Sequence, residues 1–165
     1  MPDKTLQVLC ELMIDWESQA RDLYLKFANL FSNDPKISEF WLQLSKDESR
    51  HIDILKDILN KIPREKLLMD VSNEKWNSLT RVEGLIKEVS SKKIQTLNDA
   101  YEMAHQLETS EMNILLKMLV NEYLPDEEGY KFIFSDVTEH IEKLMRFGKE
   151  YQLSQRKHIN SRNIK

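Results

Sequence analysis

The chain has 165 residues, of which 41% are hydrophobic and 32% are charged, with only 3 Gly and 4 Pro. This length suits one domain with a hydrophobic core. Strand-rich folds need many turns, and turns use Gly and Pro, so the composition disfavours a sandwich, a barrel and a disordered chain. The formal net charge of -4 argues against a nucleic-acid binder, because such proteins usually carry a basic excess.

The cysteine content and the N-terminal residues point to a cytoplasmic location. Cys10 is the one cysteine, so the chain can form neither an internal disulfide nor a CxxC metal knuckle, and this fits a reducing compartment. Asp3, Glu11 and Asp15 interrupt any signal-peptide core. No apolar run approaches the length of a membrane span, so we expect no membrane partner.

Apolar side chains recur at steps of three and four residues in four segments, which predicts four long helices. Asp34 is a good N-cap and Pro35 a good first residue for the second helix. Asp126, after Leu124 and Pro125, is placed to cap the fourth. The expected helices cover 4–32, 35–61, 91–122 and 126–153, with a crossover at 62–90 and a polar tail at 155–165.

The order of these segments predicts an all-α fold. Two helices joined by a short turn, a long connection with short helices of its own, and a second such pair form the plan of a four-helix bundle with one crossover. Adjacent helices in each pair run up and down. We expect residues 1–154 to form this single bundle.

Five ionisable residues interrupt the apolar stripes of the four helices. They are Glu17, Glu48, His51, Glu108 and His140. A buried carboxylate without a partner is very costly, and none of the four stripes contains a Lys or Arg that could pair with it. A bound cation would neutralise the group, and carboxylates with imidazoles suit iron, manganese or zinc.

The spacing of these residues repeats between the two halves of the chain. Glu48 and His51 form an E-x-x-H, which places both side chains on one helical face. The interval from Glu17 to Glu48 is nearly repeated from Glu108 to Val137, and His140 follows Val137 as His51 follows Glu48. The second half therefore has the same layout, with Val in place of one Glu.

These motifs resemble the rubrerythrin branch of the ferritin-like di-iron carboxylate proteins over roughly residues 5–150. Glu17, Ala20 and Tyr24 match the first-helix pattern E-x-x-A-x-x-x-Y. The E-x-x-H of the second helix is present as well. The resemblance extends to the third and fourth helices through Ala100, Ala104, Glu108, Glu111 and His140.

The resemblance implies a ferritin-like bundle that binds two iron ions, or one if Val137 weakens the second position. Manganese or zinc would also suit these ligands. The implied ligands are Glu17, Glu48, His51, Glu108 and His140, with Glu111 and Asp136 as further candidates. The activity implied is reduction of peroxide or O₂ with oxidation of Fe(II). One cysteine excludes the paired CxxC motifs of a rubredoxin module, so electrons would come from an external donor, and a homodimer is expected.

Two other readings stay open at this point. Val137 also fits a bundle that has lost its chemistry and has a structural or protein-interaction role. Glu102 and His105 spell a second E-x-x-H, but they lie off the centre of the stripe, which favours a solvated flank over a metal site.

Overall fold

The computed structural model describes residues 4–123 and 132–153, apart from the side chains of Glu111, Phe132, Ile133, Phe134, Asp136 and Val137. The described elements are α1 (Leu6–Leu30), α2 (Pro35–Lys61), α3 (Arg64–Leu67), α4 (Asn73–Ser91), α5 (Leu97–Glu108), α6 (Glu111–Tyr123) and α7 (Phe132–Glu150). The expected fourth-helix start at Asp126 and the tail at 155–165 lie outside the described residues.

Local side-chain caps set the ends of the first two helices. The Thr5 hydroxyl accepts from the backbone N–H of Val8 at the start of α1. Asp34 accepts from the N–H groups of Lys36 and Ile37, and Pro35 begins α2. These side chains satisfy N–H groups that have no partner inside the helix. The resulting α1–α2 hairpin is the most extensive helix pair of the fold.

The connection between the two pairs is itself mostly helical. After the single turn of α3, the Ser72 hydroxyl accepts from the N–H of Lys75, and α4 extends over 19 residues. Leu79, Val82, Ile86 and Val89 form its buried face, and α4 packs against α1 and α6. Where short helices were expected, the crossover thus contains a helix that adds to the core.

The third bundle segment consists of two helices, where one over 91–122 was expected. Thr96 and Asp99 form a capping box at the start of α5. α5 ends at Glu108, and the N–H of Thr109 bonds back to the carbonyls of His105 and Leu107. Asn113 then donates to the carbonyl oxygen of Glu108 at 2.8 Å. The chain therefore breaks its helix directly after Glu108 and keeps that buried carbonyl hydrogen-bonded.

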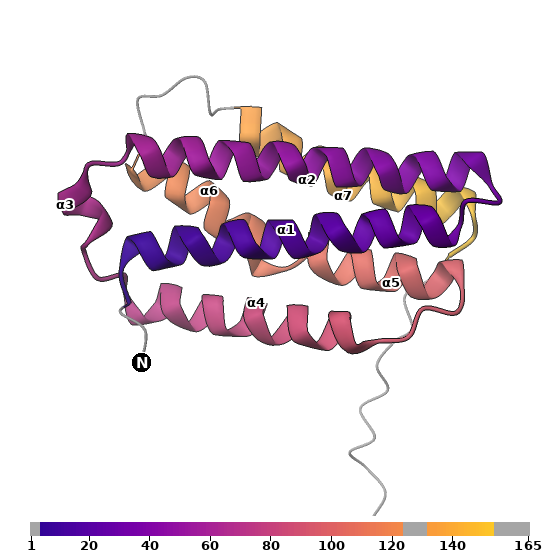
Figure 1. Ribbon diagram of the computed structural model, residues 1–165, viewed down its shortest axis with the longest axis horizontal. Coiled ribbons are helices and arrows are strands. Elements are labelled where there is room, and N and C mark those ends of the chain that lie inside the picture. Colours follow the sequence, from indigo (N-terminus) through magenta and orange to yellow (C-terminus); the bar gives the residue numbers. More distant parts are fainter. Residues whose placement is uncertain (1–3, 124–131, 154–165) are drawn as a thin grey trace, which may run out of the picture.

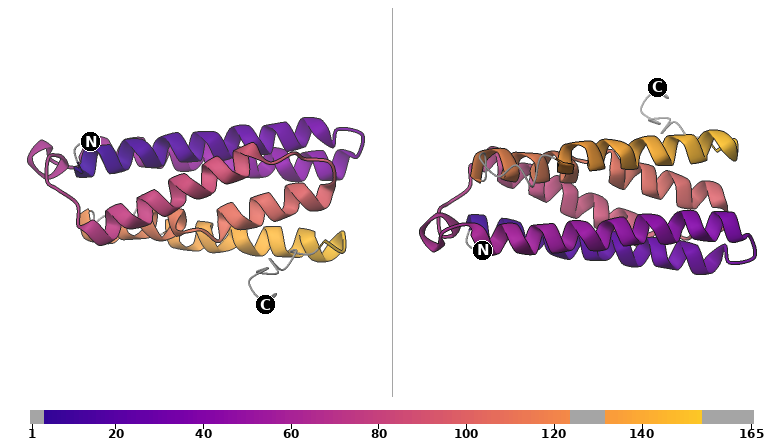
Figure 2. Two further views of the ribbon diagram at one scale, coloured as in Figure 1. Left: turned by 90° about the horizontal axis from the view of Figure 1, so that it is seen from below. Right: turned by 90° about the horizontal axis from the view of Figure 1, so that it is seen from above.

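The helices form two layers around a common core. α1 and α2 make one layer, and α5, α6 and α7 make the other (Figure 2). α4 runs parallel to α1 and returns the chain to the end where α5 begins (Figure 1). α5–α6 and α7 are then antiparallel, so the fold is a four-helix bundle with one long crossover. No helix in the described residues combines the length and the apolar composition needed to cross a membrane.

Aromatic and aliphatic side chains from every long helix fill the interior. Trp41, Tyr24 and Phe27 are among the largest fully buried residues. Tyr24 stacks on Trp41 at 6.0 Å between ring centroids, and Phe27 meets Trp41 edge-on at 4.9 Å. This aromatic group lies next to the buried ionisable residues and forms the apolar surroundings in which they are held.

Candidate metal centre

The five ionisable residues that interrupt the apolar stripes all lie inside the bundle. Each is between 0% and 4% exposed. They come from both layers: Glu17 from α1, Glu48 and His51 from α2, Glu108 from the end of α5, and His140 from α7. Because each faces inward on its own helix, residues far apart in sequence meet at one point of the core.

Glu48 lies at the middle of this group and faces both imidazoles. Its Oε2 is 3.0 Å from Nδ1 of His51, and its Oε1 is 3.7 Å from Nδ1 of His140. The two imidazole rings are 4.8 Å apart between centroids. One ligand atom from each of the three residues lies within 4.8 Å of the others. The three side chains could therefore hold a metal ion together.

Each histidine also faces a second carboxylate. Glu17 Oε2 lies 3.7 Å from Nδ1 of His51, and Glu108 Oε2 lies 3.7 Å from Nδ1 of His140. The arrangement is thus two Glu–His pairs with Glu48 between them. In both pairs Nδ1 is the ring nitrogen that points to the carboxylates.

Glu17 provides the clearest test of whether an ion fits. Both of its carboxylate oxygens are buried and lack a hydrogen-bond partner within the described residues, and the 3.7 Å contact with His51 is longer than a hydrogen bond. A buried carboxylate left in this state is very costly. A cation would satisfy it, and two imidazoles with three carboxylates are suitable donors for iron, manganese or zinc.

The pKa values of Glu48 and Glu17 without an ion also show how unfavourable it is to bury these carboxylates together. Burial raises the pKa of Glu48 well above its usual range, and the charges of Glu17 and Glu108 raise it further. Burial also raises the pKa of Glu17, but His51, with smaller contributions from Glu48 and His140, outweighs burial and leaves the pKa below its ordinary value. Carboxylates crowded in this way repel one another unless protons or cations separate them.

Glu108 is oriented by groups outside the cluster. The Tyr24 hydroxyl donates to its Oε1 at 2.6 Å, which leaves Oε2 directed at His140. Its backbone carbonyl accepts from Asn113 across the break between α5 and α6. The side chain and the backbone of Glu108 are therefore both anchored at the point where its helix ends.

Comparison with known proteins assigns the chain to a protein family. The family model described as Rubrerythrin matches residues 11–147, which covers most of the chain and every residue of the cluster. The chain belongs to the rubrerythrin family. A search of curated proteins and a search of solved structures gave no match. The all-α bundle is thus ferritin-like, as the sequence predicts, and the rubrerythrin family typically binds iron.

Three residues named from the rubrerythrin resemblance have side chains outside the described part of the structure. These are Glu111, Asp136 and Val137. Whether Glu111 or Asp136 ligates a metal therefore stays a prediction. Glu102 and His105, the second E-x-x-H, are only half-buried and do not belong to the cluster.

Sequence reasoning missed Asp47, which touches the rubrerythrin-type cluster from outside. Its carboxylate is 1% exposed, and Oδ2 lies 3.2 Å from Nε2 of His140 and 3.4 Å from Nζ of Lys143. Burial raises the pKa of Asp47, but His140, Lys143 and Arg50 lower it to about 2. A signal was present in the sequence, because Asp47 lies three residues after Leu44 and four before His51, on the buried face.

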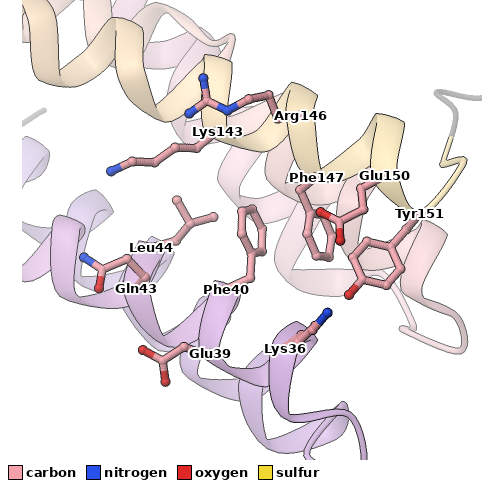
Figure 3. Close-up of a pocket in the computed structure, with 10 residues that line it drawn as sticks. All are labelled: Lys36, Glu39, Phe40, Gln43, Leu44, Lys143, Arg146, Phe147, Glu150 and Tyr151. Carbon is pink, nitrogen blue, oxygen red and sulfur yellow. The ribbon is translucent and has the colours of Figure 1, made fainter.

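A surface pocket opens between α2 and α7 (Figure 3), and two of its lining residues, Gln43 and Lys143, contact Asp47. Its volume is about 480 Å³, and its walls combine aromatic rings with charged side chains. Phe40 and Phe147 stack with 3.8 Å between their centroids, and Lys143 extends from α7 along the wall. None of the cluster residues lines this pocket, but Lys143 on its wall contacts Asp47, which in turn lies 3.2 Å from His140.

Proposed function

We propose that this rubrerythrin-family protein is a non-haem iron oxidoreductase that reduces peroxide or O₂. The observation that supports this most is the pair of carboxylate oxygens on Glu17 that are buried without a hydrogen-bond partner in the described structure, beside Glu48 and two imidazoles. A purely structural cluster would be expected to satisfy those oxygens with protein donors.

The geometry favours two ions rather than one. Glu17 and His51 would hold one ion, and Glu108 and His140 would hold the other. Glu48 turns one carboxylate oxygen toward each histidine and would contribute to both positions. Iron bound here would supply the redox chemistry, in which Fe(II) is oxidised while peroxide or O₂ is reduced.

The protein's own contribution is to hold the ligands still and keep the site dry. The cluster lies in a core that contains many buried Leu and aromatic side chains, and the Tyr24 hydroxyl holds one oxygen of Glu108. Ligand geometry that is set in advance, in a site shielded from water, is what proteins add to the reactivity of a metal.

The electron donor, the cellular location and the assembly belong to the same proposal. The chain has one cysteine, so it lacks paired CxxC motifs and would need a separate protein to reduce its iron again. A reducing cytosol is the compartment that the single buried thiol suits. From the family resemblance, we also propose that the protein forms a homodimer.

Metal analysis of protein purified without chelator and then loaded anaerobically with Fe(II) tests the proposal. About two ions per chain is the expected result, and about one would mean that Val137 has reduced the site to a single position. Failure to bind any metal after loading would overturn the proposal.

A kinetic measurement separates an active enzyme from a bundle that has lost its chemistry. The Fe(II)-loaded protein is mixed with peroxide or with O₂ in a stopped-flow spectrometer, and oxidation of the iron is followed by absorbance. We expect faster oxidation than for the same Fe(II) in buffer. If the bound iron oxidises no faster than free iron, the protein binds metal but does not have the proposed activity.

A further inference from the structure

A separate and much smaller pocket lies where α1, α4 and α5 meet. Its volume is about 10 Å³, close to the smallest space that holds one molecule the size of water. The outer rim consists of Gln19 and Ser90, which are exposed, and of half-buried Leu23. The inner end consists of side chains that are between 1% and 6% exposed, namely Ala20, Ile86, Val89 and Leu107.

The inner end of this pocket is built on the helical turns that carry two candidate ligands. Ala20 follows Glu17 by about one turn of α1, and Leu107 directly precedes Glu108 at the end of α5. One turn advances only about 5.4 Å along a helix. The helix α4, which runs alongside α1 (Figure 1), supplies the third wall. The pocket therefore leads from the surface beside α4 toward the carboxylate cluster.

The chemistry of the lining favours an apolar molecule. None of the four side chains at the inner end has a hydrogen-bonding group. At the rim, the Gln19 amide already donates to Asp15 at 2.7 Å. Apolar cavities in proteins stay dry and take up apolar gases, whereas peroxide would bury two hydroxyl groups without partners, which is costly. The larger pocket between α2 and α7 has several charged side chains in its walls and suits polar solutes better.

We propose that the pocket between α1, α4 and α5 is the entrance through which O₂ reaches the cluster. This inference rests on the proposed function and narrows its oxidant from peroxide or O₂ to O₂. Ala20 is the residue that keeps the inner end open, because a larger side chain on this turn of α1 would fill a space of this size. O₂ passes the inner end during brief movements of the side chains around it.

Dissolved O₂ is itself the probe for the first test, because it is paramagnetic and speeds the relaxation of nuclei that it approaches. Methyl relaxation is measured by NMR on metal-free protein under O₂ pressure and under N₂ pressure. We expect O₂ to act more strongly on the methyls of Ala20, Val89 and Leu107 than on those of Leu144, which is as deeply buried as Val89. An effect no larger than at Leu144 would overturn the proposal.

A Ser90→Phe variant places a ring over the rim without adding bulk to the core. The effect of O₂ on Leu107 should fall to the level of Leu144, and Thr80→Phe, at another exposed position of α4, should leave it unchanged. Ala20→Leu fills the inner end and should act in the same way. Should Ala20→Leu not fold, as judged by circular dichroism, Ser90→Phe decides alone. An unchanged effect of O₂ in the folded Ser90→Phe protein would overturn the proposal.

Stopped-flow oxidation of the Fe(II)-loaded protein extends the test to the reaction. In Ser90→Phe, oxidation by O₂ is expected to slow about tenfold or more, because the added ring must move aside for each molecule. Oxidation by peroxide, measured in the absence of O₂, should change less than about twofold, as is usual for a surface substitution. Equal slowing with both oxidants would overturn the assignment of this entrance to O₂.

The two kinds of measurement separate this inference from the proposed function. If the wild type binds no Fe(II), the proposed function fails, yet methyl relaxation still decides whether O₂ enters the bundle by this pocket. If the protein binds Fe(II) and oxidises it, but O₂ acts no more strongly on Ala20 and Leu107 than on Leu144, only the entrance proposed here fails.

Discussion

Tyr24 on α1 donates its hydroxyl hydrogen to Oε1 of Glu108 on α5 over 2.6 Å, and so joins the first helix pair to the second inside the core. Burial raises the pKa of Tyr24 well above its ordinary value, and the charge of Glu108 raises it further. The phenol therefore stays protonated and remains a donor at neutral pH.

Tyr24→Phe should lower the free energy of unfolding of the metal-free protein by about 1.5–3 kcal/mol, because a hydrogen bond to a buried carboxylate is lost. Urea unfolding at pH 7 measures the change. Tyr151→Phe is the matched control, since Tyr151 is only half-buried and should lose less than about 0.5 kcal/mol. Equal stabilities of the two variants would show that the bond to Glu108 contributes little.

Glu48→Gln should abolish metal binding, because it removes the ligand that faces both histidines. The metal-free stability is expected to stay unchanged or to rise, because burial and the charges of Glu17 and Glu108 already disfavour the charged form of Glu48, and Gln keeps its shape without the charge. Metal content and urea unfolding are measured on the same preparation. Glu39→Gln, at an exposed position of α2, is the control, and normal metal binding by the Glu48 variant would contradict the assignment.

The metal-free protein should lose stability as the pH rises from 6.5 to about 10. Burial lowers the pKa of His140, but Asp47 and Glu108 raise it from 6.5 to about 10. Because the pKa of His140 is higher in the folded than in the unfolded protein, its protonation stabilises the fold. This stabilisation is complete below pH 6.5, the unfolded pKa, and is lost as the pH rises through the folded pKa. The free energy of unfolding of chelator-treated protein, measured with urea across this pH range, should fall as the pH rises, and His140→Gln should make this fall smaller. The same dependence on pH in both proteins would contradict the assignment.

Gly148→Ala should destabilise the protein by about 1–3 kcal/mol through overpacking. A Cβ at this position would lie 2.5 Å from Cζ of Tyr101, so the ring or α7 must move. Gly84→Ala is an informative comparison, because a Cβ there meets nothing within 4 Å and alanine should stabilise α4 by about 0.5–1 kcal/mol. Thermal unfolding should therefore show a lower melting temperature than the wild type for Gly148→Ala and a higher one for Gly84→Ala.

Cys10 should react with a thiol reagent only when the protein unfolds. Burial raises the pKa of its thiol to about 12, and neighbouring Glu11 adds to the shift. The thiolate is the reactive form, so at pH 8 the native protein should give almost no colour with a disulfide reagent, and the urea-unfolded protein one equivalent. Rapid reaction of the native protein would mean that α1 opens readily.

Much of the fold followed from the spacing of apolar residues and from local caps. Asp34 and Pro35 predict the start of α2, and the stripe that contains Trp41 and Leu55 predicts its buried face. Periodicity could not place the break after Glu108, because the stripe continues through Leu115. The break depends on Ser110 and Asn113, whose side chains bond to the backbone at a point that only the packed bundle defines.

The sequence by itself determined that Glu17, Glu48, His51, Glu108 and His140 interrupt apolar helical faces, since residue type and a period near 3.6 suffice for that. Only the tertiary structure decided that Glu48 faces both histidines, that Tyr24 meets Glu108, and that Asp47 reaches His140 from the far side of its ring. These contacts join helices distant in the chain. Their distances depend on how the helices rotate and pack against one another, which a pattern within one helix does not encode.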